Sequence, residues 1–289
     1  MNKIGIYYAY WTHDWDVDFH PFVDKVADLG FDILEVNAGT IANMTSTERK
    51  ALKEHADARG ITLSYCIGLP AAYDVASENA AIRKRGLEYL EKMIVGIGEM
   101  GGGPLGGITY SYWPGTLPEN VDKRLIVDRS IASMKEVAKM AVENNVVMVL
   151  EVVNRFEQFI MNCCDEALDY VKRVDNPNVK IMLDTFHMNI EEDTIGGAIE
   201  KAGPYLGHLH IGENNRRPPG YGHIPWGELA TALKKINYQG YIVMEPFLMP
   251  GGQVGRDIKV FRDLSIGVDL DEEAGKAVRF MRKILSEAA

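Results

Sequence analysis

The chain has 289 residues, of which 46% are hydrophobic and 25% are charged, and this composition is typical of a folded globular protein. It carries 31 basic and 41 acidic residues, which give a formal net charge of −10 at pH 7. An acidic balance of this size disfavours binding to nucleic acid or to an anionic membrane surface, because both require a basic face.

The sequence predicts a cytoplasmic protein. Cys66, Cys163 and Cys164 are odd in number and lack the Cys-x-x-Cys spacing of a zinc or redox motif, and the roles of the last two stay open. The opening run KIGIYYAYW lacks the basic and then apolar segments of a secretory signal. No apolar run approaches the roughly 20 residues that a membrane-spanning helix needs.

Runs of apolar, β-branched and aromatic residues alternate along the whole chain with segments of helical periodicity. We predict strands at 3–11, 31–38, 61–68, 106–113, 146–153, 180–186, 207–213 and 241–247. We predict helices at 19–30, 45–60, 78–100, 129–145, 165–174, 194–202, 226–237 and 271–285. Thr45 with Glu48 fits a capping box at the second helix, and Gly30 and Gly60 stand where helices should end.

Eight strands that alternate with eight helices predict an α/β fold, a (β/α)8 TIM barrel, as a single domain over residues 1–289. No linker or low-complexity stretch indicates a second domain. A doubly wound open sheet is the alternative, but such a sheet rarely reaches eight repeats. It also usually has a glycine fingerprint after its first strand, and the segment YYAYWTHDW has none.

Four consecutive predicted strands end in a residue that can bind a metal. These residues are Glu151, Asp184, His210 and Glu245. Any one of them alone would be read as a cap or an ion-pair partner. In a barrel of this kind, however, the carboxyl ends of the strands meet at the face where active sites form. Crowded carboxylates repel one another unless a cation lies between them, so the pattern predicts one divalent ion.

The donor set of three carboxylates and one imidazole is mainly oxygen-rich. Such a set suits Mn2+ best and leaves Mg2+ or Co2+ possible, and it differs from the thiolate or multi-histidine sets of structural zinc.

Other polar and aromatic residues follow the predicted strand ends. Glu157, His187, Arg216 and Arg217 would each be an ordinary solvated residue in isolation, but their shared position above the metal favours substrate contacts for some of them. Aromatic residues at strand ends are as often plain core, but as a group that faces a metal they resemble walls for the apolar faces of a sugar, with Cys66 as a small neighbour. They are Tyr7, Trp11, Trp15, Tyr110, Trp113 and Phe247.

The motifs EVVNRFEQF, LDTFHMNIEED, GHLHIGENNRRPPGYGHIPW and VMEPF resemble those of the D-tagatose 3-epimerase family, and in particular of its D-psicose (D-allulose) 3-epimerase members. The resemblance extends over essentially the whole chain. It implies a xylose-isomerase-like barrel and one Mn2+ or Co2+ ion per subunit. It also implies reversible inversion of free ketohexoses at C3, between D-psicose and D-fructose or D-tagatose and D-sorbose, by a homodimer or homotetramer.

Carried over by position, the resemblance implies that the four strand-end residues bind the metal and that Glu151 and Glu245 are also the acid/base pair. Glu157, His187 and Arg216 would hold the O1 and O2 end of the sugar. The residues that would shape the pocket around the other end are Tyr7, Trp15, Cys66, Ile108, Trp113 and Phe247. Some relatives have Phe in place of Tyr7 and Leu in place of Ile108, which leaves the preferred sugar open.

Epimerisation at C3 through an enediolate needs a base on each face of the carbon, whereas an aldose–ketose isomerase can work with one. Glu151 and Glu245 end the fifth and eighth strands and can therefore face each other across the metal. One alternative is a related barrel isomerase that acts on hydroxypyruvate or another sugar. A second is a sugar-phosphate epimerase that binds the phosphate with the loop 249–257. The others are an endonuclease and a non-catalytic sugar-binding protein. The net charge disfavours the endonuclease, and opposed carboxylates on a metal disfavour a binding protein.

Overall fold

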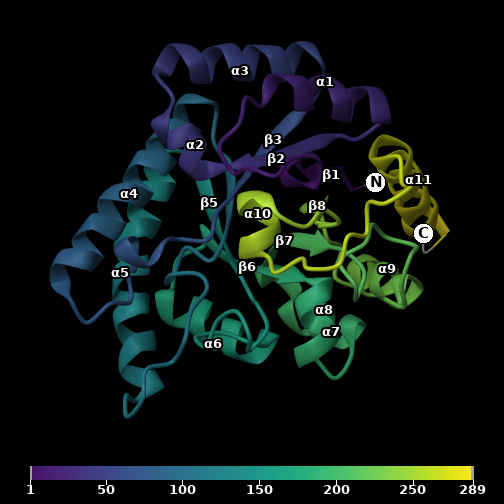
Figure 1. Cartoon of the computed structure of the whole chain (residues 1–289). Coiled ribbons are helices and arrows are strands. Elements are labelled where there is room, and N and C mark those ends of the chain that lie inside the picture. Colours follow the sequence, from purple (N-terminus) through teal and green to yellow (C-terminus); the bar gives the residue numbers. More distant parts are fainter. Residues whose placement is uncertain (1, 288–289) are drawn as a thin grey trace.

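The computed structural model describes residues 2–287 and confirms the predicted barrel (Figure 1). Eight parallel strands form one closed sheet in chain order, each paired with its sequence neighbours, and β8 pairs with β1 to close the ring. The strands are β1 (Ile4–Tyr7), β2 (Ile33–Asn37), β3 (Thr62–Cys66), β4 (Gly103–Gly107), β5 (Val146–Glu151), β6 (Val179–Asp184), β7 (Leu206–Ile211) and β8 (Tyr241–Met244).

Helices surround the barrel, as the alternating pattern predicts. The long ones are α1 (His20–Leu29), α3 (Ser46–Ala58), α4 (Ala80–Glu99), α5 (Lys123–Glu143), α6 (Cys164–Val174), α8 (Ile195–Ala202), α9 (Trp226–Lys235) and α11 (Leu270–Glu287). Short helices that the sequence analysis did not predict follow three of the strands: α2 (Ala38–Asn43), α7 (Thr185–Glu191) and α10 (Gly252–Asp257).

The predicted helix-end signals are confirmed. The Thr45 side chain accepts a hydrogen bond from the backbone N–H of Glu48, and the Glu48 carboxylate accepts one from the backbone N–H of Thr45, which completes the capping box of α3. Gly30 ends α1 with a φ of 85°, a left-handed conformation that glycine adopts without steric cost.

The predicted position of the fourth strand, 106–113, was wrong. β4 is Gly103–Gly107, and the glycines that flank it resemble a turn in sequence. The packing explains its composition, because a Cβ on Gly106 would lie 2.8 Å from Sδ of Met182 and one on Gly107 would lie 2.2 Å from the carbonyl oxygen of Ile67. The strand is therefore built from residues that leave room for their neighbours across the barrel.

Two other boundaries differ from prediction by four residues or more. The first strand ends at Tyr7, and residues 8–11 form a 3-10 turn. Helix α5 begins at Lys123 and not at 129, because Asp122 caps it by accepting a hydrogen bond from the backbone N–H of Arg124. The prediction therefore missed residues 123–128 of this helix, whose sequence is KRLIVD.

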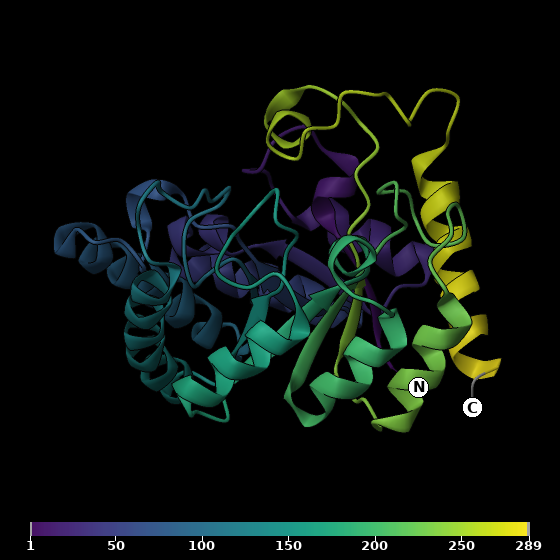
Figure 2. The same ribbon diagram turned by 90° about the horizontal axis from the view of Figure 1, so that it is seen from below.

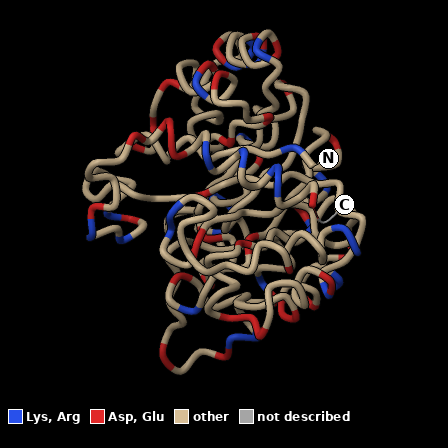
Figure 3. The backbone as a smooth tube through the Cα atoms, turned by 90° about the vertical axis from the view of Figure 1, so that its right-hand side faces the viewer, with Lys and Arg blue, Asp and Glu red and all other residues tan. Residues whose placement is uncertain are grey.

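The loops at the carboxyl ends of the strands build the face that carries the site. The segment between β8 and α11, which includes α10, extends over this end of the barrel (Figure 2). Within residues 2–287, no helix combines the length and the apolar character needed to cross a membrane. Lys and Arg are interspersed with Asp and Glu along the side of the molecule that Figure 3 shows.

Candidate metal centre and active site

The structure brings the four strand-end residues together. Glu151 ends β5, Asp184 ends β6, His210 lies near the end of β7 and Glu245 directly follows β8. The sheet register places Asp184 beside His210. One ligand atom from each of the four residues lies within 4.8 Å of the others, and all four side chains are buried. The shared depth follows from the fold, because parallel neighbouring strands end at the same face.

The chemistry of this cluster fits a divalent cation. Oδ2 of Asp184 and Nδ1 of His210 are buried, and neither makes a hydrogen bond to the described part of the chain. Buried polar atoms of this kind are costly unless they meet a partner. Three carboxylates and an imidazole nitrogen supply the oxygen-rich set that Mn2+, Mg2+ or Co2+ accepts. The residues present therefore fit an ion, and the donor set alone does not select among these metals.

The protonation of the cluster reflects crowded carboxylates. Burial, and next the neighbouring Glu245, raise the pKa of Glu151 well above its usual value. Burial also opposes the ionisation of Asp184, but His187 and Arg216 outweigh it and lower the pKa of that carboxyl. Glu151 thus takes up the proton that relieves the repulsion, and a cation bound among the carboxylates would favour its release.

His187 faces the cluster from α7, in a defined tautomer. Its Nδ1 accepts hydrogen bonds from the backbone N–H of Asn154 at 3.2 Å and from Nδ2 of Asn154 at 2.7 Å. The ring proton therefore lies on Nε2, which is 3.8 Å from Oε1 of Glu151 and 4.0 Å from Oδ2 of Asp184. Burial lowers the pKa of His187, so the ring is a neutral donor pointed into the site.

Arg216 contacts the cluster from the loop after β7. Its guanidinium lies 3.9 Å from the ring centre of Phe186, and Nη1 donates to Oε2 of Glu245 at 2.8 Å. The residue has a φ of 62°, a conformation that side chains other than glycine rarely adopt. The buried carboxylate of Glu213 anchors this loop by accepting hydrogen bonds from the backbone N–H of Gly220 and from Nε1 of Trp226.

Glu157 connects the polar and aromatic parts of the site. Its Oε2 accepts a hydrogen bond from Nε1 of Trp113 at 3.0 Å, and its Oε1 lies 3.8 Å from Nη2 of Arg216. Burial opposes the ionisation of Glu157, but the charge of Arg216 and the hydrogen bonds from Trp113 and Asn154 outweigh it and lower the pKa. Glu157 is therefore an ionised acceptor beside the metal ligands.

A pocket of about 400 Å³ opens above the cluster. Glu151 and Glu245 line its base, whereas Asp184 and His210 lie beneath the surface with 1% and 0% exposure. The predicted substrate-binding residues that line the pocket are Tyr7, Trp15, Cys66, Ile108, Trp113, Glu157, His187 and Arg216.

Three predicted aromatic walls take other positions. Phe247 packs edge-on behind Tyr7, with ring centres 6.4 Å apart, and is not among the residues that line the pocket. Tyr110 is buried with its hydroxyl donating to the backbone carbonyl of Glu151, and Trp11 packs between Tyr10 and Phe22. The expectation that Tyr110 and Trp11 form walls of the pocket was wrong, because both lie in the aromatic core around the strand ends.

Several residues of the site were not predicted from the sequence. Asn154 orients His187, and Asp257 on α10 lines the pocket and accepts a hydrogen bond from Nε1 of Trp15 at 2.7 Å. Oε1 of Glu35, in the middle of β2, lies 2.5 Å from Nε2 of His210. Only Glu35 carried a usable signal, since a carboxylate inside an apolar strand needs a buried polar partner. Further lining residues without a signal are Asn37, Pro70, Tyr89 and Ile258.

Comparison with known proteins agrees with this geometry. Residues 23–284 match the family model of the xylose isomerase-like TIM barrel. The chain is 47% identical to D-psicose 3-epimerase of Ruminiclostridium cellulolyticum, with 98% of each chain covered. It is 44% identical to D-psicose 3-epimerase of Agrobacterium fabrum, covering 98% of this chain and 99% of that one.

A crystal structure of D-psicose 3-epimerase with D-tagatose from Clostridium cellulolyticum H10 superposes on this chain with a TM-score of 0.96. The two are 47% identical, and the superposition covers 98% of this chain and 99% of that one. The similarity to these relatives extends over nearly the whole barrel. The chain belongs to the D-psicose 3-epimerase family of xylose isomerase-like TIM barrels.

Proposed function

We propose that this protein is a metal-dependent ketose 3-epimerase that interconverts free ketohexoses at C3. One observation carries the proposal: a buried cluster of three carboxylates and one imidazole at the base of a pocket, with the two glutamates contributed from opposite ends of the set of strands β5–β8. The names of the relatives, D-psicose 3-epimerase, support it.

In this function Glu151, Asp184, His210 and Glu245 hold the ion. A divalent cation supplies Lewis-acid polarisation of the C2 carbonyl and stabilises the negative charge that develops when the C3 proton leaves. Glu151 and Glu245 both line the pocket and each can exchange a proton with one face of C3. Asp184 and His210 lie beneath them and act as ligands without competing as bases.

The residues around the ion hold the carbonyl end of the sugar. Nε2–H of His187 and the Arg216 guanidinium are donors for substrate oxygens, and Glu157 is an acceptor for a hydroxyl group. Tyr7, Trp15, Cys66, Ile108 and Trp113 shape the other end, and Phe247 supports Tyr7 from behind.

The charges of the pocket favour a neutral sugar over a sugar phosphate. Among the described residues that line it, Arg216 is the one Arg or Lys side chain, and it is already paired with Glu245. The carboxylates of Glu151, Glu157, Glu245 and Asp257 line the same pocket and would repel a phosphate dianion. Free D-psicose with D-fructose, and D-tagatose with D-sorbose, are therefore the substrates that we propose.

The remaining parts of the proposal concern the cofactor and the assembly. We propose one ion per subunit, with Mn2+ preferred over Co2+ and Mg2+, and a homodimer or homotetramer of single-domain barrels spanning residues 1–289 in the cytoplasm. Exposed Phe156, Phe261 and Ile266 support an oligomer, since they are 70%, 85% and 78% accessible in the single chain.

The deciding experiment is incubation of the Mn2+-loaded enzyme with each free ketohexose, followed by chromatographic separation of the C3 epimers. We expect conversion of D-psicose to D-fructose and of D-tagatose to D-sorbose, each approached from both directions. Hydroxypyruvate and ketohexose 6-phosphates, assayed in parallel, should turn over poorly. Efficient conversion of either compound without ketohexose epimerisation would instead support a related isomerase or a sugar-phosphate epimerase.

A further inference from the structure

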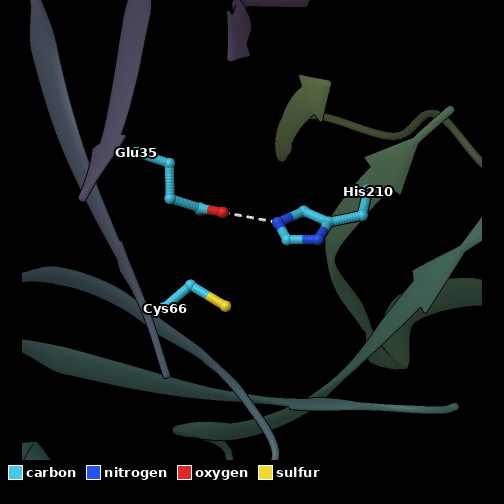
Figure 4. Close-up of side chains that lie close together, drawn as sticks. All are labelled: Glu35, Cys66 and His210. Atoms are coloured by element: carbon cyan, nitrogen blue, oxygen red, sulfur yellow. Dashed lines mark hydrogen bonds and ion pairs between the residues drawn. The ribbon is translucent and has the colours of Figure 1, made fainter. Parts of the chain in front are cut away.

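Another buried carboxylate, outside the four proposed ligands, lies behind them. Glu35 extends from the middle of β2 across the barrel interior towards His210 on β7, and its side chain is 1% exposed (Figure 4). Oε1 of Glu35 lies 2.5 Å from Nε2 of His210, a hydrogen-bond distance. None of the roles proposed above uses this residue.

The two ring nitrogens of His210 face different groups. Nε2 meets Glu35, whereas Nδ1 lies 3.6 Å from Oε1 of Glu245 and 3.9 Å from Oε1 of Glu151. An ionised carboxylate can only accept a hydrogen bond, so its contact with Nε2 requires the proton on that nitrogen. The lone pair of a neutral ring is then on Nδ1, the nitrogen that faces the other ligands.

Glu35 is itself held in place. Its Oε2 accepts a hydrogen bond from Oγ of Ser64 at 2.9 Å, and Nε2 of His208 lies 3.1 Å from the same oxygen. Ser64 is the residue opposite Glu35 in the register of β2 and β3. One carboxylate oxygen is therefore fixed to the barrel wall, and this leaves the other directed at His210.

We propose that Glu35 is a positioning residue of the metal centre, which fixes the tautomer and the orientation of His210 so that Nδ1 faces the ion. This inference rests on the proposed function, in which His210 is a ligand. A carboxylate that accepts a hydrogen bond from the N–H of a metal-bound imidazole also makes the ring a stronger donor to the metal.

The geometry argues against a separate metal site at the same place. Donor atoms of Glu35, Cys66 and His210 also lie within 4.8 Å of one another. However, two ligands of one ion, each bonded at about 2.0–2.3 Å, stand roughly 3 Å or more apart, and the contact between Glu35 and His210 is 2.5 Å. Cys66 lies beside this pair and takes no part in their contact (Figure 4).

The test compares Mn2+ affinity in two variants of the whole enzyme. Glu35→Met keeps the length of the side chain but removes the acceptor, and Glu35→Gln keeps one uncharged acceptor oxygen. Mn2+ is titrated into each protein, and free Mn2+ is measured by electron paramagnetic resonance. We expect Glu35→Met to bind Mn2+ about 10- to 100-fold more weakly than the wild type. The Mn2+ affinity of Glu35→Gln should lie between those of Glu35→Met and the wild type. The control is Asp74→Asn, because the buried Asp74 accepts hydrogen bonds from Ala76 and Ser111 and contacts no proposed ligand; it should bind Mn2+ as the wild type does.

A spectroscopic measurement tests whether Glu35 acts through its hydrogen bond to His210 or only by filling space. With 15N-labelled histidine and diamagnetic Mg2+, the wild type should show a strongly deshielded Nε2–H proton that Glu35→Met lacks.

If Glu35→Met does not fold, Glu35→Gln and Ser64→Ala replace it, and both should weaken Mn2+ binding by a smaller factor. Wild-type affinity in folded Glu35→Met, or in both replacement variants, would overturn the inference. So would two bound ions per chain, one of them lost in Cys66→Ser.

His210→Asn distinguishes this failure from failure of the proposed function. If His210→Asn loses the ion while Glu35→Met keeps it at wild-type affinity, only the positioning role is wrong. If His210→Asn binds Mn2+ as tightly as the wild type, the metal centre itself is misassigned, and the positioning role is overturned with it.

Discussion

Arg216 donates from Nη1 to Oε2 of Glu245 at 2.8 Å, so a fixed positive charge meets a carboxylate that we propose both binds the metal and transfers a proton. The guanidinium is held against the Phe186 ring on one side and near Asp184 on the other, with Nη1 3.6 Å from Oδ2. Its planar fork can keep the contact with Glu245 through one nitrogen while another meets a sugar oxygen.

Replacement of Arg216 by Ala should weaken turnover of ketohexoses while the enzyme still binds one ion. Loss of a charged hydrogen bond to the substrate costs about 1.5–3 kcal/mol, so we expect kcat/KM to fall roughly 10- to 100-fold. Steady-state kinetics together with metal analysis would measure both effects. Arg217→Ala is the matched control, because the neighbouring Arg217 is not among the residues that line the pocket. Wild-type kinetics in Arg216→Ala would remove Arg216 from the substrate site and make Arg217 the next candidate.

Tyr7→Phe should change sugar preference without changing metal affinity. Tyr7 lines the pocket at the end of β1, with its ring 6.4 Å from those of Trp15 and Phe247. Removal of the Tyr7 hydroxyl affects only sugars whose own hydroxyl groups reach it. The ratio of kcat/KM for D-psicose to that for D-tagatose should therefore shift several-fold, because one neutral hydrogen bond contributes roughly 0.5–1.5 kcal/mol. Equal changes for all ketohexoses, or a loss of bound Mn2+, would contradict a role in specificity.

The site could be predicted from the sequence where local pattern and topology coincide. Glu151, Asp184, His210 and Glu245 each terminate an apolar run, and a parallel barrel places all such termini on one face. Glu35 lies inside the apolar strand β2, yet its partner His210 is 175 residues away in sequence, and no local pattern indicates which side chain crosses the barrel to meet it.

Packing between elements explains the other differences from prediction. β4 consists largely of glycine because Met182 and Ile67 occupy the space that its side chains would fill, and a sequence read one segment at a time cannot show those neighbours. Asp257 reaches Trp15 only because the segment after β8 folds back over the start of the chain, where the backbone N–H groups of Gln253 and Val254 donate to the carbonyl of His13.

Saturating Mn2+ should raise thermal stability, and chelation should abolish turnover. The ion binds the folded state through four strands, so a concentration of about 100 times Kd should add about 2.7 kcal/mol to the free energy of unfolding. Differential scanning calorimetry of chelated and Mn2+-loaded samples would measure the shift. Mn2+ or Co2+ should restore activity better than Ca2+, whose larger coordination shell suits this compact set poorly. Equal melting temperatures, or full activity in a metal-free sample, would contradict the metal centre.

The stabilisation by Mn2+ should grow as pH rises. In the metal-free fold, burial and Glu245 raise the pKa of Glu151, so over the pH range above the usual carboxyl pKa the folded state holds a proton that the unfolded chain has lost. The metal-free protein therefore loses stability as pH increases through that range. The metal-bound protein needs Glu151 ionised and escapes this loss of stability.

The difference between the melting temperatures of the metal-free and Mn2+-bound proteins should accordingly widen with pH. Mn2+ binding should also release protons, which can be counted by calorimetry in buffers of different ionisation enthalpy. A difference independent of pH would contradict the raised pKa.

The paired-base mechanism predicts that each glutamate is needed for inversion but not for exchange. Glu151 and Glu245 are both buried at the base of the pocket, and His210 Nδ1 lies between 3.6 and 3.9 Å from an oxygen of each. Glu→Gln at either position keeps the side-chain size and removes the base, so epimerisation should fall by about 10²- to 10⁴-fold in both variants. In D2O the wild-type product should carry deuterium at C3 once the protonated glutamate has exchanged with solvent.

The single variants also separate two bases from one. With one glutamate left, a proton can still leave and return on the same face of C3, so each variant should exchange the C3 hydrogen of only one epimer, and the two variants should exchange opposite epimers. Because each glutamate is also a proposed ligand, the metal content must first be restored with excess Mn2+ and measured. NMR of recovered D-psicose and D-fructose would then report exchange and inversion together. A metal-replete Glu151→Gln or Glu245→Gln enzyme that still inverted C3 at nearly the wild-type rate would show that one base serves both faces, and the proposed division of labour between β5 and β8 would be wrong.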